Sequence, residues 1–113
     1  MNSQKEIDPI TSCERWFVIA NDNKIWHRLD GPAFIYKNGD YVWYKMGVAH
    51  RDYGPAIFVA GNESWVNNGV YHRLDGPAYY PPNMQPQWWF NGKYIVCKSQ
   101  KEFEQLLKLK AFW

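Results

Sequence analysis

The chain has 113 residues and carries 7 Trp, 8 Tyr and 6 Phe, so aromatic side chains make up 19% of it. This length fits one domain that buries roughly two-thirds of its unfolded surface. The aromatic content excludes a disordered chain, and no apolar run approaches the roughly 18 residues of a membrane span. The 13 Lys and Arg and 11 Asp and Glu are spread evenly, and a net charge of +2 predicts no basic face for duplex nucleic acid.

The two ends of the chain differ in composition from its centre. Residues 1–14 are polar, lack the apolar stretch of a signal peptide and predict a mobile tail. A repeat β-sheet over 15–98 and a C-terminal helix over 99–113 complete the expected single domain. Cys13 and Cys97 lie far apart without a CxxC pattern, which favours two reduced thiols in a cytosolic protein, with a disulfide as the alternative.

A heptapeptide repeats three times along the chain. The copies are HRLDGPA at 27–33, HRDYGPA at 50–56 and HRLDGPA at 72–78. Trp43 and Trp65 each precede the next copy at the same distance, Trp88 opens a fourth, truncated copy, and Trp16 opens the first. Because the heptapeptide and the tryptophan recur with the same spacing between them, the sequence predicts a repeat architecture with a period of about 22 residues.

Each repeat contains two kinds of turn. Asn-Gly pairs at 38–39, 68–69 and 91–92 lie between short aromatic and β-branched runs, which is typical of type I′ hairpin turns. At the other end of each strand pair, Gly-Pro ends the strand because proline has no N–H for a ladder. The sequence therefore predicts a mainly β fold, a single curved antiparallel meander of β-hairpin repeats with roughly eight to ten strands.

The third connection and the C-terminus depart from this plan. Residues 80–87 contain three prolines and predict an irregular loop. Residues 99–102 read Ser-Gln-Lys-Glu, a capping box, and Phe103, Leu106 and Leu107 follow at helical spacing. We expect a helix over about 100–111 that is packed on the sheet and covers one of its sides.

All three histidines of the chain, His27, His50 and His72, occupy the same repeat position. Equivalent positions in successive two-strand units lie about 10 Å apart, whereas zinc ligands must lie within about 2 Å of one ion. None of the four serines is next to a histidine, so a catalytic triad would lack its nucleophile. We therefore expect no metal site, no cofactor and no enzymatic activity.

The repeated polar residues favour a structural role. The Asp before Gly-Pro can accept amides of its own turn, and the neighbouring Arg or His can pair with it. In the middle copy the acid is at Asp52 and Tyr53 takes its place, a shift that a scaffold tolerates better than three identical ligand sites would. The expected structural residues are His27, Asp30, Trp43, His50, Trp65, His72, Asp75 and Trp88.

The aromatic residues divide into two groups. Trp43, Trp65 and Trp88 recur at the repeat period and should form a core stripe under the helix. Several of the other aromatic residues fall at the alternate strand positions, which point to the opposite face of the sheet. Some of them should therefore be exposed and mark an interaction site. These candidate binding residues are Tyr36, Tyr41, Phe58, Tyr71 and Tyr79.

The pattern WYxxGxxHRxDGPA, seen at residues 43–56 and 65–78, resembles the MORN-like repeats of tailed bacteriophages and giant DNA viruses. The ending WWFNGKYI, followed by the capped EFEQLLKLK segment, is also similar to the phage versions. The resemblance covers about residues 16–112. It implies a curved antiparallel ribbon, a viral or prophage origin and the cytoplasm of an infected bacterium. It also implies a binding platform, mostly for proteins, without assigning an activity.

Three hypotheses of function follow. The first is a non-enzymatic protein that binds and inhibits a bacterial host or defence protein through an aromatic sheet face. The second is a nucleotide or single-stranded nucleic-acid binder, in which aromatics stack on bases and Arg28, Arg51 and Arg73 contact phosphates. The third is a structural homo-oligomer, such as a homodimer, joined through open sheet edges.

Overall fold

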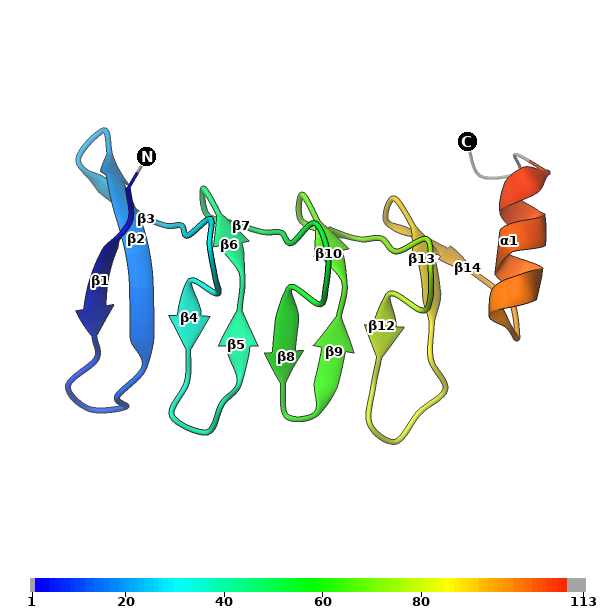
Figure 1. Cartoon of the computed structure of the whole chain (residues 1–113), viewed down its shortest axis with the longest axis horizontal. Helices are drawn as coiled ribbons and strands as arrows, with labels where there is room; N and C mark the ends of the chain where they lie inside the picture. The colour runs from blue at the N-terminus through cyan, green and yellow to red at the C-terminus, as the bar shows by residue number, and fades with distance from the viewer. Residues whose placement is uncertain (1, 110–113) are drawn as a thin grey trace.

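The structure is a computed structural model that describes residues 2–109. It confirms a mainly β fold of antiparallel hairpins with one C-terminal helix. The hairpin units lie side by side in chain order along the longest axis, with the helix at the far end (Figure 1). The principal extents of 48 × 32 × 18 Å describe an elongated ribbon.

The elements follow one another in the order of the repeats. The strands of the first half are β1 (Gln4–Ile7), β2 (Glu14–Ala20), β3 (Asn23–Trp26), β4 (Phe34–Ile35), β5 (Tyr41–Val42), β6 (Tyr44–Lys45) and β7 (Val48–Ala49). The second half holds β8 (Ile57–Val59), β9 (Asn62–Ser64), β10 (Val66–Asn67), β11 (Val70–Tyr71), β12 (Tyr79–Tyr80), β13 (Trp88–Phe90), β14 (Lys93–Ile95) and the helix α1 (Gln100–Lys108).

The strands form one main sheet and three small ones, so the expected single meander is wrong in this detail. The main sheet has the order β1-β2-β4-β5-β8-β9-β12, with β3 paired to β2, while β6–β7, β10–β11 and β13–β14 are separate pairs. The reason lies at the repeat tryptophans. The Trp43 N–H donates to the Ala56 carbonyl at 2.7 Å, whereas the Trp43 carbonyl accepts from the His50 N–H at 3.1 Å. Each Trp thus marks where the chain changes its pairing partner.

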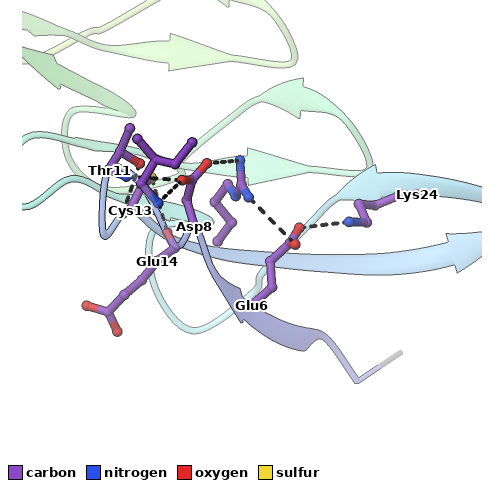
Figure 2. A network of polar contacts seen from close by, with 8 residues as sticks. Glu6, Asp8, Thr11, Cys13, Glu14 and Lys24 are labelled. Carbon is purple, nitrogen blue, oxygen red and sulfur yellow. Dashed lines mark hydrogen bonds and ion pairs between the residues drawn. The ribbon is translucent and has the colours of Figure 1, made fainter.

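The expected mobile tail over 1–14 is wrong, because residues 4–7 form β1 along the outer edge of β2. The polar residues that suggested a tail make ion pairs across this edge. Glu6 lies 2.8 Å from Lys24 and 3.6 Å from Arg15, and Asp8 lies 3.4 Å from Arg15. Figure 2 shows Lys24 directed at Glu6, with the backbone of Thr11 beside Asp8. Paired charges of this kind also protect an edge strand from further strand pairing.

Two of the three Asn-Gly turns have the conformation that the sequence predicts. Asn68 and Gly69 have φ values of 49° and 84°, and Asn91 and Gly92 have 46° and 80°. Positive φ at both positions is the type I′ geometry that matches the twist of the flanking strands. The turn at 38–39 differs, because Gly39 alone has a positive φ, of 93°. The proline-rich stretch between β12 and β13 is an irregular loop, as expected, closed by an isolated bridge between Tyr79 and Gln87.

The helix begins at the predicted Ser99 cap, but only one half of the predicted capping box forms. The Ser99 hydroxyl accepts the Glu102 N–H at 3.2 Å, and the Glu102 carboxylate accepts the Lys98 N–H at 3.0 Å. The Ser99 bond satisfies one donor of the first helical turn, whereas the Glu102 carboxylate binds the residue before the cap instead of the Ser99 N–H that a capping box uses. The helix ends at Lys108, and the part of the prediction beyond residue 109 lies outside the described residues.

The helix does not cover a side of the sheet as expected, but packs on the last hairpin at the end of the ribbon (Figure 1). Phe103, with 0% of its surface exposed, packs with Trp88, Phe90 and Ile95. The Trp88 indole N–H also donates to the side-chain oxygen of Gln100 at 2.8 Å. The physical reason is that this hairpin has no following repeat, so its apolar end needs a cover.

Both cysteines are free thiols, Cys13 buried and Cys97 half-buried. Burial raises the pKa of each thiol, so neither is an activated nucleophile. The two thiols are therefore part of the packing rather than a chemical site.

Candidate functional site

In each full copy of the repeat, an arginine side chain lies over the ring of the repeat tryptophan. The distances from the guanidinium carbon to the ring centroid are 3.9 Å for Arg28 over Trp16, 4.3 Å for Arg51 over Trp43 and 3.7 Å for Arg73 over Trp65. A guanidinium over an indole face is a favourable cation–π arrangement. The Trp and the Arg of one repeat thus form a single packing unit.

The glycine of Gly-Pro-Ala closes the other side of this unit. A Cβ on Gly31, Gly54 or Gly76 would lie 2.7, 2.6 or 2.7 Å from the Cζ atom of the arginine in the same copy. The guanidinium also donates from Nη1 to the proline carbonyl at 3.1, 3.1 and 3.2 Å. We call this arrangement the Trp–Arg–Gly stack. It explains why Trp, Arg and Gly recur at fixed spacing.

The aspartate of the repeat pairs with the arginine next to it in the turn, as the sequence predicted. Arg28 Nε lies 3.1 Å from Asp30, and Arg73 Nε lies 2.8 Å from Asp75. The hydrogen bond from Arg73 lowers the pKa of the Asp75 carboxyl. In the middle copy the acid pairs with the histidine instead, because Asp52 lies one residue closer to His50 in sequence and 2.9 Å from its Nε2 atom. The predicted pairing within the turn is therefore confirmed.

The histidines join each repeat to the next one. The Nδ1 atoms of His27, His50 and His72 accept the backbone N–H of Met46, Asn68 and Asn91 at 2.9, 2.9 and 3.0 Å. The donors are the first residues of the type I′ turns in the following repeat, whose N–H groups have no partner within their own hairpin. A ring nitrogen that accepts must be unprotonated. We call this contact the inter-repeat histidine hydrogen bond.

A second hydrogen bond reinforces each of these contacts. The glycine N–H of the same turn donates to the carbonyl of the residue that precedes the histidine. The pairs are Gly47 to Trp26 at 2.7 Å, Gly69 to Ala49 at 2.9 Å and Gly92 to Tyr71 at 2.8 Å. Sequence reasoning missed this inter-repeat role, although the nearly constant distance from each histidine to the next turn was a signal for it.

Nine side chains hold equivalent positions along the ribbon, three at each repeat junction. Within one junction they are the residue before the histidine, the residue after the alanine and the residue after the next tryptophan. The first triad is Trp26, Phe34 and Tyr44, the middle triad is Ala49, Ile57 and Val66, and the third is Tyr71, Tyr79 and Trp89. We call the set the apolar row.

The first and third triads are filled by aromatic rings in contact. Phe34 lies 4.8 Å from Trp26 and 5.4 Å from Tyr44, measured between ring centroids. In the third triad, Tyr71 lies 5.5 Å from Tyr79 and 5.0 Å from Trp89. Such edge and stacked contacts stabilise a sheet beyond the area they bury.

The middle triad has no aromatic ring and leaves a hollow. Ala49, Ile57 and Val66 line a cavity of about 280 Å³ together with Gly69 and Tyr71. The lining is mostly apolar, and the aromatic triads lie on either side of it along the ribbon. This is a cavity of the size and character that takes a large side chain.

The five predicted binding residues do not share one face, so that expectation is wrong. Tyr71 and Tyr79 belong to the apolar row, whereas Tyr41 and Phe58 stack on each other at 5.7 Å. The cross-strand register puts Tyr41 and Phe58 opposite each other and one position out of step with Ile57, so they lie on the other face of the sheet. Tyr36 is exposed at the hairpin turns and lines a separate hollow of about 490 Å³.

The expected tryptophan stripe under the helix is also wrong in part. Trp88 contacts the helix, but Trp43 and Trp65 are covered by Arg51 and Arg73 of their own repeats. The predicted phosphate-contacting arginines therefore hold structural positions within the Trp–Arg–Gly stacks. Long cationic side chains can cover apolar rings in this way because their stems and planes pack while one edge stays in water.

Comparison of the chain with protein-family models, with curated proteins and with solved structures found no match. The resemblance to MORN-like repeats therefore stays a prediction. Among residues 2–109, no helix is long and apolar enough to cross a membrane. In the same part of the chain, no three His, Cys, Asp or Glu side chains are grouped to hold a metal ion.

The inter-repeat histidine hydrogen bonds make stability depend on pH. Burial lowers the pKa of His27 and His72 below the ordinary value of 6.5, so the unfolded chain binds protons at a pH where the folded chain does not. This stability is fully present above pH 6.5 and is lost as the pH falls towards the folded-state pKa. We expect the free energy of unfolding, measured with urea, to fall by about 1–2 kcal/mol from pH 7.5 to pH 5.5.

The control for this measurement is the double variant His27→Gln, His72→Gln, which cannot bind the protons. Carboxylates titrate mostly below this window, so the variant should lose most of the pH dependence. A wild-type protein that is equally stable or more stable at pH 5.5 would contradict the role of these histidines.

The Trp–Arg–Gly stack predicts a specific effect of Gly76→Ala. The added Cβ displaces the Arg73 guanidinium from Trp65 and from the Pro77 carbonyl, so we expect the free energy of unfolding to fall by about 1–2 kcal/mol. In an Arg73→Ala background the same change should have an effect below about 0.5 kcal/mol, because nothing is left to displace. Equal effects in both backgrounds would show that the stack is not the cause.

Proposed function

We propose that this chain is a non-enzymatic binding protein that receives a protein partner on the apolar row, with the hollow of the middle triad as the anchor point. The observation that carries the proposal is the contrast between the three triads. The flanking repeats fill the equivalent positions with aromatic rings, whereas Ala49, Ile57 and Val66 leave a cavity of about 280 Å³. A large apolar side chain of the partner would fill it.

The chemistry of the row supports a protein as the partner. Protein interfaces concentrate their binding energy in a few apolar or aromatic side chains that insert into pockets with aromatic surroundings. Tyr71, which lines the hollow, is part of the stacked third triad and therefore offers a rigid wall. A preorganised wall reduces the entropy lost on binding.

The polar groups of the repeat support a non-enzymatic role. The histidines accept hydrogen bonds from the next repeat, and the arginines lie between tryptophan and glycine. Groups engaged in this way are not free to transfer protons or attack a substrate. A binding function needs none of them.

The partner class comes from the resemblance to phage repeat proteins. It favours a bacterial host or defence protein in the cytoplasm of the infected cell, inhibited because the bound chain covers part of its surface. The nucleotide alternative has less support, because Arg28 and Arg73 each hold a carboxylate of their own turn. The homodimer alternative has less support as well, because charged pairs line the β1 edge and the helix covers the opposite end.

The variant Ala49→Tyr tests the proposal. It copies Tyr71, which holds the equivalent position one repeat later, so the chain should fold with unchanged or higher stability while the hollow is filled. The wild type is used as bait in bacterial lysate, and the captured proteins are measured by quantitative mass spectrometry. We expect the Ala49→Tyr bait to capture at least about tenfold less of a protein that the wild type enriches.

A matched control is Ile19→Tyr, which adds an aromatic ring at an exposed position of β2 and should leave the capture unchanged. The proposal fails if the wild type enriches no protein over a tag control. It also fails if Ala49→Tyr captures the same proteins in the same amounts.

A further inference from the structure

Among the residues that the structure describes, Arg51, in the middle copy of the repeat, lacks the carboxylate partner that Arg28 and Arg73 have in the other two copies. In the first and third copies, Asp30 and Asp75 accept from the Nε atom of the arginine two residues earlier. In the middle copy this position is Tyr53, whose side chain points into solvent with 91% of its surface exposed. Within residues 2–109, no carboxylate lies within ion-pair distance of Arg51.

The neighbouring acid does not take over this role. Asp52 is held by His50, whose Nε2 atom lies 2.9 Å from the carboxylate. The His50 ring accepts the Asn68 N–H at Nδ1, which leaves Nε2 as the protonated nitrogen that donates to Asp52. Asp52 is therefore paired with His50 and lies beyond ion-pair distance of Arg51.

The same arginine lines a small cavity between the first and middle repeats. The cavity measures about 70 Å³, and its walls are Arg28, Leu29, Trp43, Lys45, Arg51 and the paired His50 and Asp52. A water molecule takes about 30 Å³ of liquid, so the cavity holds roughly two waters or one tetrahedral or planar oxyanion group.

The charges around the cavity favour an anion. Arg28, Lys45 and Arg51 bring three positive charges, and Asp30 and Asp52 bring two negative ones, with Asp30 bound to Arg28. The net surplus is one positive charge, because the neutral His50 ring leaves the Asp52 carboxylate charged. The residues equivalent to Lys45 in the next repeats are Asn67 and Phe90, so this basic cluster belongs to one junction of the ribbon.

We propose that this cavity binds one oxyanion group, a phosphate or a carboxylate, at the position on Arg51 that Asp30 and Asp75 occupy on their own arginines. The anion accepts from Arg51 Nε, and Lys45 lies in the wall beside it. Charge-assisted hydrogen bonds from a guanidinium held on a tryptophan ring are short and directional. This site shares no lining residue with the hollow of the middle triad, so the two proposals stand or fall separately.

The test follows the arginine Nε–H signals by NMR while sodium phosphate replaces sodium chloride at constant ionic strength. We expect a large saturable shift of the Arg51 signal, a smaller saturable shift at Arg28, which lines the same cavity, and only an unsaturated change at Arg73. A parallel titration with sodium acetate identifies the source, because tighter phosphate binding indicates a phosphorylated ligand and tighter acetate binding indicates a carboxylate. Equal and unsaturated shifts at all three arginines in both titrations would overturn the proposal.

Two substitutions at one exposed position separate anion binding from a general charge effect. Tyr53→Asp recreates the internal carboxylate of the other copies and should weaken phosphate or acetate binding by at least about tenfold. Tyr53→Asn removes the same ring but adds no charge, so it should bind as the wild type does. Unchanged binding by Tyr53→Asp, or equal loss in both variants, would contradict the site.

Lys45→Gln provides a third readout. Lys45 is exposed in the short β6–β7 hairpin, so the substitution should leave the fold intact, which the unchanged thermal midpoint would confirm. We expect it to weaken binding several-fold while the Arg51 signal keeps the same direction of shift. Binding that is unaffected by the loss of this charge would place the anion elsewhere.

Discussion

The hydrogen bond from each type I′ turn to the histidine of the preceding repeat is the interaction on which the ribbon depends. The first residue of such a turn has an N–H that its own hairpin cannot satisfy, and an unpaired backbone donor in a packed junction is costly. His27, His50 and His72 supply the acceptor, one per junction. The bond fixes the distance between repeats, and it places the next residue, an arginine, over the tryptophan. The Trp–Arg–Gly stack and the apolar row both follow from this placement.

The two ends of the ribbon are closed by different means, as repeat proteins require. At the start, β1 pairs with β2 and carries ion pairs along its outer edge. At the end, Ile95 occupies the position that histidine holds in the full copies, and it is buried against Phe103 of the helix with 1% exposed. An apolar contact thus replaces the inter-repeat hydrogen bond where no further turn follows. The middle junction is the one where aromatic packing gives way to a cavity.

The features that the sequence predicts correctly are local ones. The type I′ turns at 68–69 and 91–92, the Ser99 cap and the pairing of Asp30 with Arg28 depend on residues a few positions apart, whose chemistry determines their geometry. The position of the helix, and the fact that residues 4–7 form a strand instead of a mobile tail, depend on which surfaces the rest of the chain leaves uncovered. The composition of these segments does not encode which surfaces those are. The hollow brings together Ala49, Ile57 and Val66 from separate strands. Their small size in one repeat was visible in the sequence, but their meeting in space followed only from the way the strands pair.

The central claim is that each repeat histidine accepts a hydrogen bond at Nδ1 from the next repeat. The most direct measurement is a long-range ¹H–¹⁵N NMR spectrum of the histidine rings at neutral pH, which distinguishes the two neutral tautomers and the imidazolium. The account predicts that His27, His50 and His72 all carry their proton on Nε2 and have an unprotonated Nδ1. A protonated Nδ1 on these rings, as the other tautomer or as imidazolium, would contradict it.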